Sequence, residues 1–145
     1  MQDLFPVSDW PADHDPALMQ PLVLAYLGDS CYDLYVRTRL ARSCQSQSGQ
    51  LHSRAVRFVC AKGQARSLAA LTLTPEEEDI VRRGRNAKPA TVAKHASLAD
   101  YHAATAFEAL LGYLYLMGRF DRAGEIMDMA FRAAEKEEKH APGTP

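Results

Sequence analysis

The sequence lacks several features that would assign a chain of this size to a specialised class. Its three cysteines include no C-x-x-C pair, and their odd number argues against a disulfide framework or a zinc site. No apolar run approaches the roughly 20 residues that are needed to span a bilayer. Residues 1–15 are acidic and contain proline, unlike the basic start of a secretion signal. We therefore expect a cytoplasmic protein without a membrane segment.

Charges of one sign are missing from long stretches of the chain. Residues 1–33 contain six acidic residues and no lysine or arginine, and residues 34–75 contain no aspartate or glutamate. The net charge is −6 over residues 1–33, +8 over residues 34–99 and −3 over residues 100–145. This segregation favours a basic surface that binds a polyanion. The alternative is that the three blocks neutralise one another in the folded protein.

Apolar residues recur at spacings of three and four, which predicts an all-α fold without strands. The length suits one domain, expected over residues 16–139, after an irregular lead-in (1–15) and before a disordered tail (140–145). Thr74, Pro75 and Glu77 form a strong helix-start signal, because threonine and glutamate at this spacing can form a capping box. The predicted helices cover residues 16–42, 49–71, a short segment from residue 75, 99–117 and 121–139.

Two acidic residues interrupt the most apolar helices of the two halves of the chain. Asp29 follows Gly28 in the first helix, and Glu108 lies in the middle of the helix over residues 99–117. A buried carboxylate without compensation costs several kcal/mol. If the two acids meet, they need a cation between them, and hard oxygen ligands favour Mg²⁺ or Mn²⁺. Two alternatives remain: Gly28–Asp29 is a turn between two short helices, with Asp29 as the N-cap of the second, or Glu108 pairs with an arginine of residues 49–71.

A second candidate site is a group of polar and cationic residues within the +8 block. Glycine and proline end the short helix that begins at Pro75 and leave its cationic residues on a loop. Lys62 lies on the basic flank of residues 49–71. Such side chains can contact phosphates, sugars or base edges, although basic loops are also common on solvated surfaces. The candidate RNA-binding residues are Lys62, Arg82, Arg83, Arg85, Asn86 and Lys88.

Four stretches carry a family resemblance. They are Leu24–Asp29 with Tyr32 and Tyr35–Arg37; Leu51–Ala55 with Phe58–Val59 and Ala61–Lys62; Arg82–Lys88; and Thr105–Leu114. In this order, over roughly residues 16–135, they resemble the ribonuclease III catalytic domain, in the variant found in Mini-III ribonucleases.

The resemblance implies a metal-dependent endoribonuclease with the helical fold of the ribonuclease III endonuclease domain, in a homodimer that cuts double-stranded RNA. Asp29 and Glu108 occupy the positions of the family's catalytic metal ligands, and Mg²⁺ or Mn²⁺ is the implied cofactor. For Mini-III ribonucleases the implied substrate is the precursor of large-subunit (23S) ribosomal RNA. The resemblance leaves open whether a ribosomal protein presents this substrate.

The sequence departs from the longer ribonuclease III enzymes at two positions near the acids. Ala25 and Thr105 stand where those enzymes have carboxylates, so water and substrate must supply more of the metal ligands. We also expect no double-stranded-RNA-binding domain to follow, so that the +8 block binds RNA alone. Two rivals are a non-catalytic RNA-binding or ribosome-associated protein on this scaffold and a helical DNA-binding regulator.

Overall fold

The computed structural model describes residues 4–5, 7–11, 14–43, 48–88 and 97–140, and all elements within these ranges are helical. This confirms the predicted all-α class. None of the described helices combines the length and the apolar character required to cross a membrane. The predicted tail lies outside the described residues from position 141 onward. The elements are η1 (Pro16–Leu18), α1 (Pro21–Ser43), α2 (Ser48–Val59), α3 (Ala61–Ala69), α4 (Pro75–Arg85), α5 (Leu98–Leu116) and α6 (Phe120–His140).

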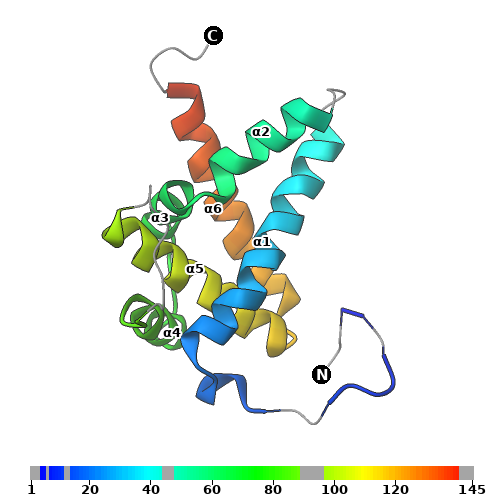
Figure 1. Cartoon of the computed structure of the whole chain (residues 1–145), viewed down its shortest axis with the longest axis vertical. Coiled ribbons are helices and arrows are strands. Elements are labelled where there is room, and N and C mark those ends of the chain that lie inside the picture. Colours follow the sequence, from blue (N-terminus) through cyan, green and yellow to red (C-terminus); the bar gives the residue numbers. More distant parts are fainter. Residues whose placement is uncertain (1–3, 6, 12–13, 44–47, 89–96, 141–145) are drawn as a thin grey trace.

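Helix α5 is the centre of the fold. It is apolar nearly all round, and α1, α3 and α4 pack against it over most of its surface (Figure 1). Burial of this helix removes several large side chains from water, each of which contributes about 1.5–3 kcal/mol. The sequence predicted this buried central helix. Its fully buried side chains include Ala106, Phe107, Leu110, Leu111 and Leu114.

The prediction of one helix over residues 49–71 is wrong in one respect, because the structure has two helices there, α2 and α3, which are separated at Cys60. Cys60 has an extended conformation (φ −67°, ψ 160°) and precedes the first residue of α3. Gly63 allows the tight corner, because a Cβ at this position would lie only 2.8 Å from the carbonyl oxygen of Phe58. The apolar spacing continues across the corner, so periodicity alone could not reveal it.

The first predicted helix also begins differently. Asp15 caps only the short helix η1, where its Oδ1 accepts a hydrogen bond from the Ala17 backbone N–H at 3.0 Å. The backbone is extended at Met19, and α1 begins at Pro21, because proline disfavours a helical conformation for the residue before it. From there α1 continues without interruption past Asp29. The alternative of a turn at that aspartate is therefore wrong.

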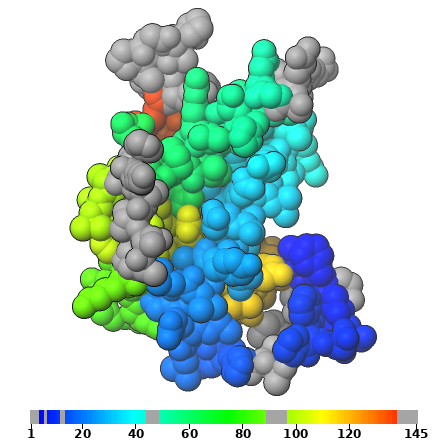
Figure 2. Space-filling model, viewed as in Figure 1, coloured from blue at the N-terminus to red at the C-terminus, as the bar shows by residue number. Residues whose placement is uncertain are grey.

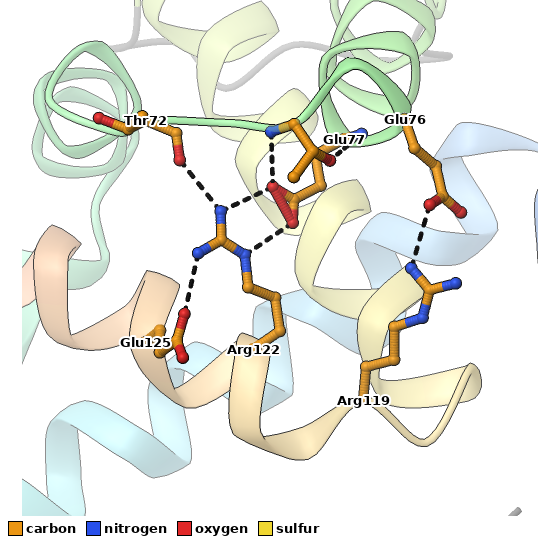
Figure 3. Close-up of polar contacts among 7 residues, drawn as sticks. Thr72, Glu76, Glu77, Arg119, Arg122 and Glu125 are labelled. Carbon is orange, nitrogen blue, oxygen red and sulfur yellow. Dashed lines mark hydrogen bonds and ion pairs between the residues drawn. The ribbon is translucent and has the colours of Figure 1, made fainter.

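Helix α4 is anchored at its N-terminus by buried charge. The predicted capping box between Thr74 and Glu77 is present. Glu77 is 2% exposed, and its carboxylate accepts hydrogen bonds from Nε and Nη2 of Arg122 on α6 at 2.8 and 2.7 Å (Figure 3). Beside this pair, Arg119 forms an ion pair with Glu76 at 3.2 Å. These contacts fix the helix whose other end carries Arg82, Arg83 and Arg85 of the predicted RNA-binding residues.

Candidate active site

Two glycines allow α1 and α5 to cross with their backbones in contact. A Cβ on Gly28 would overlap the backbone carbonyl of Glu108, and a Cβ on Gly112 would overlap the backbone carbonyl of Leu24. The missing side chains therefore permit an approach that no other residue could accept. Asp29 follows Gly28 directly, so the crossing also brings Asp29 close to Glu108.

The two acids line one pocket of about 390 Å³ on the surface of the bundle. Figure 2 shows this face, where a small part of α5, in yellow, is exposed between α1 and α3. Ala25 and Thr105, the positions where carboxylates are absent, line the same pocket. The remaining wall residues are Leu22, Tyr26, Ala61, Tyr101 and Ala104.

Burial raises the pKa of both carboxylates, and nearby acids add to each shift. Burial raises the pKa of Glu108 to about 7, and the nearby Asp29 carboxylate adds to this rise. Asp29, expected on or beside the packed face, is exposed, yet the partial burial of its carboxylate also raises its pKa, and Asp33 adds to the shift. Ionising both groups is therefore unfavourable unless positive charge enters the pocket.

No cation of the described chain supplies that charge. Among the described residues neither Asp29 nor Glu108 forms an ion pair, so the alternative pairing of Glu108 with an arginine of residues 49–71 is wrong there. In the described part of the chain, no group of three or more acidic, histidine or cysteine side chains is arranged to hold a metal ion by itself. Two carboxylates that repel each other in an open pocket suit a divalent cation whose other ligands are water or substrate oxygens.

The structure places the predicted RNA-binding residues in different environments. Lys62, Arg85, Asn86 and Lys88 are exposed, and the three cations among them form no ion pair with described residues. Arg82 is exposed and pairs with Asp79 at 2.5 Å. Arg83 is half-buried and donates from Nη1 to the Ala17 carbonyl (2.7 Å) and from Nη2 to the Met19 carbonyl (3.0 Å). Its guanidinium therefore holds η1 against α4.

The opposite charge blocks neutralise each other only in part. Arg39 pairs with Asp128 at 3.3 Å and Arg66 with Glu137 at 3.5 Å, so some cations of the +8 block meet acids of α6. Both pairs are exposed, and such pairs contribute about 0–1 kcal/mol.

Sequence reasoning missed one buried polar residue on α3. Gln64 lies on α3 with 1% of its surface exposed, and its Nε2 donates a hydrogen bond to the Val59 carbonyl at 2.9 Å. A glutamine within a basic helical segment is expected on the surface. Only the unexpected corner at Cys60, which turns α3 against α5, explains why Gln64 is buried.

Comparisons with known proteins agree with this architecture. The family model described as "Ribonuclease III domain" matches residues 22–119, the span that contains both acids and the whole of α5. The chain therefore belongs to the ribonuclease III family, and it is a ribonuclease.

Relatives and a solved structure narrow the assignment. The chain is 50% identical to Mini-ribonuclease 3 of Brevibacillus brevis, over 85% of this chain and 93% of the relative. It is 47% identical to Mini-ribonuclease 3 of Symbiobacterium thermophilum, over 80% and 91% of the two chains. A crystal structure of a Fusobacterium nucleatum protein aligns with a TM-score of 0.74 and 25% identity, over 83% of this chain and 98% of that chain. Within the family, the chain groups with the Mini-ribonuclease 3 proteins.

Proposed function

We propose that this ribonuclease cleaves double-stranded RNA at the pocket between α1 and α5, with Asp29 and Glu108 as the ligands of Mg²⁺ or Mn²⁺. The observation that supports this most strongly is the pair of acids in one pocket, whose pKa values are both raised by burial and which have no ion-pair partner in the described chain. When bound, a divalent cation activates water and offsets the charge that develops on a scissile phosphate.

The side chains around the acids would determine how substrate and water reach them. Ala25 and Thr105 leave space where the longer enzymes have carboxylates, so substrate and water oxygens can approach Asp29 and Glu108. Tyr26 and Tyr101 form other parts of the wall and can contact the sugar–phosphate backbone. The two acids hold the cation in place, and their separation on two rigid helices keeps the site geometry fixed.

The exposed cations would bind the duplex backbone. Lys62 follows Ala61 of the pocket wall, and Arg85, Asn86 and Lys88 lie at the end of α4. Arg82 can join them when it releases Asp79, whereas Arg83 contributes mainly by fixing η1. Recognition would rest on the A-form shape and the phosphates more than on base sequence.

The proposal extends to assembly and substrate, for which the family assignment is a support. We infer a homodimer, supported by an exposed apolar strip on α1 that includes Val23 (51% exposed), Tyr26 (79%) and Leu34 (57%). Two copies would present two pockets to the two strands of one duplex. The precursor of 23S ribosomal RNA in the cytoplasm is the proposed substrate, and a ribosomal protein that presents it is a candidate partner.

The test is cleavage of a duplex RNA by Asp29→Asn, with Asp121→Asn at an exposed position outside the pocket as the control. We expect the first variant to lose cleavage by at least about 100-fold while it still binds RNA, because the loss of a direct ligand weakens metal binding at least as much as the loss of an outer partner. The control should cut normally. Undiminished cutting by Asp29→Asn, or preference for duplex DNA in a competition assay, would refute the proposal.

A further inference from the structure

Thr105 is a buried polar residue whose side chain makes no hydrogen bond within the described fold. The residues classed as polar or charged that are buried in the described chain are Gln64, Ser67, Glu77 and Thr105. The first three each form at least one side-chain hydrogen bond with another described residue. The side chain of Thr105 forms none within the described part of the chain. Its hydroxyl group therefore does not support the fold by hydrogen bonding.

Packing does not explain the Thr105 hydroxyl either. A threonine within a helix can satisfy its hydroxyl by donating to the carbonyl four residues earlier. Thr38 on α1 does so, with its Oγ1 2.7 Å from the Leu34 carbonyl oxygen. Thr105 lies in the middle of α5, where the equivalent acceptor is the Tyr101 carbonyl, and it does not form this bond. Valine is also branched at Cβ and would fill the same space without an unpaired hydroxyl.

The Thr105 hydroxyl opens into the pocket that contains the two acids. The fully enclosed polar side-chain atoms without a partner in the described chain belong to Tyr32, Gln64 and His102, so the Thr105 oxygen is not sealed from solvent. Thr105 lines the pocket together with Asp29 and Glu108. It precedes Glu108 by three residues on α5, and side chains at this spacing are neighbours, with Cβ atoms about 5–6 Å apart. A group bound at the Glu108 carboxylate is therefore within reach of this hydroxyl.

The pocket wall offers few side-chain hydrogen-bond donors to an RNA phosphate. When ionised, Asp29 and Glu108 only accept hydrogen bonds, as phosphate oxygens do. A cation offsets these charges, but a phosphate oxygen that the cation does not contact leaves water on entering the pocket and needs a donor. The donors of the wall are the hydroxyls of Tyr26, Tyr101 and Thr105. Tyr26 is 79% exposed, whereas Thr105 is 5% exposed on the central helix, where packing holds its hydroxyl in place.

We propose that Thr105 binds the substrate by donating a hydrogen bond from its hydroxyl to a phosphate oxygen of the RNA strand in the pocket. This inference rests on the proposed function, because it requires RNA to be cleaved at Asp29 and Glu108. The carboxylate that the longer enzymes have at this position would repel the same phosphate oxygen. Hydrogen bonds to charged groups are roughly twice as strong as neutral ones, so loss of this donor should lower kcat/KM by about 10- to 100-fold.

The experiment measures kcat/KM for a duplex RNA in Mg²⁺, together with the thermal midpoint of unfolding in EDTA. Thr105→Val removes the donor and keeps the branched shape, whereas Thr105→Ser keeps the donor. Thr38→Val is the matched control, because the Thr38 hydroxyl is satisfied within α1 and lies outside the pocket wall. We expect Thr105→Val to lose about 10- to 100-fold in kcat/KM at an unchanged or higher midpoint. Thr105→Ser should recover most of this loss, and Thr38→Val should cut normally.

Binding of Mn²⁺ to the RNA-free protein separates a contact with the substrate from a contact with the cation. Thr105→Val should bind Mn²⁺ as the wild type does in electron paramagnetic resonance, because the hydroxyl acts on the phosphate. A loss of Mn²⁺ affinity by the same factor as the loss in kcat/KM would assign the hydroxyl to the cation and overturn the proposal.

The other outcomes distinguish this inference from the proposed function. If Asp29→Asn cuts as the wild type does, the proposed active site itself fails. If Asp29→Asn is inactive and Thr105→Val retains the wild-type kcat/KM, only the role of the hydroxyl is overturned. Thr105→Ser as defective as Thr105→Val would also overturn it, because shape would then matter rather than the donor. A lower thermal midpoint for Thr105→Val would do the same, because the fold would then need the hydroxyl.

Discussion

Gly28 lies so close to Glu108 that a Cβ on the glycine would overlap the glutamate's backbone carbonyl. The contact joins the two helices that carry the acids, and it is made by backbone atoms that cannot move aside as a flexible side chain can. The distance between the two carboxylates therefore depends on this glycine.

Gly28→Ala is expected to destabilise the protein by about 3 kcal/mol or more, because overpacking against backbone forces α1 and α5 apart. Gly124→Ala on α6 is the matched control, since nothing lies within 4 Å of its added Cβ. Alanine there should stabilise by about 0.5–1 kcal/mol through its higher helix propensity. Urea denaturation of the two variants measures both effects. Equal stabilities would show that the helices do not meet at Gly28.

The features that the sequence predicted correctly depend on local or averaged properties. The central helix α5 follows from apolar residues around its whole circumference, and the start of α4 follows from the Thr74 and Glu77 spacing. The meeting of Asp29 and Glu108 was predicted because each acid is isolated in an apolar helix. Their roles as metal ligands stay a prediction.

The features that the sequence could not show depend on tertiary contacts. The corner at Cys60 leaves the apolar spacing intact on both sides, so a continuous helix was expected. Arg83 was expected on a basic surface, but its guanidinium binds the backbone carbonyls of Ala17 in η1 and of Met19 just after it. The partner acceptors are backbone atoms that lie far away in the chain, and no residue pattern identifies them.

The stability of the metal-free protein should fall as the pH rises from about 5 to 8. The pKa of Glu108 is about 7 in the folded protein against an ordinary value of 4.5, so over this range the folded state binds more protons than the unfolded state. Proton linkage then lowers the free energy of unfolding by roughly 3 kcal/mol across the transition. Urea titrations in EDTA at several pH values measure this, and Glu108→Gln should lose most of the slope, since the raised pKa of Asp29 supplies a smaller part of the same sign. A variant with the wild-type slope would show that another group is responsible.

Arg122→Met is expected to destabilise the fold by about 3–5 kcal/mol, because it leaves the buried Glu77 carboxylate without its counter-charge. Arg132→Met, which breaks an exposed pair with Asp128, is the control and should cost less than about 1 kcal/mol. Arg122 lowers the pKa of Glu77, so the stability that this pair supplies is lost as the pH falls below about 4.5. Similar costs for the two variants in chemical denaturation would contradict this view of the anchor.

Thr105→Asp should convert a wall residue of the pocket into a third carboxylate. Thr105 is 5% exposed and lines the pocket with Asp29 and Glu108, and aspartate has a similar volume. In EDTA the variant should be less stable than wild type, because a third acid adds repulsion. Mg²⁺ should restore more stability to it than to Thr105→Asn, the uncharged control, in thermal unfolding. Equal responses to Mg²⁺ would place the cation elsewhere.

Arg83 and Arg85 should separate folding from RNA binding, although they lie on the same helix. Arg83→Ala removes two charged hydrogen bonds to the backbone carbonyls of Ala17 and Met19, each of which contributes about 1.5–3 kcal/mol, so it should lower stability. Arg85 is exposed without an ion pair in the described chain, so Arg85→Ala should leave stability unchanged. Arg85→Ala should weaken duplex binding, and about one counterion fewer should be released on binding, so the affinity should depend less steeply on salt concentration. Denaturation and RNA titrations at several salt concentrations distinguish the two, and a reversed pattern would mean that Arg83 contacts the RNA while Arg85 supports the fold.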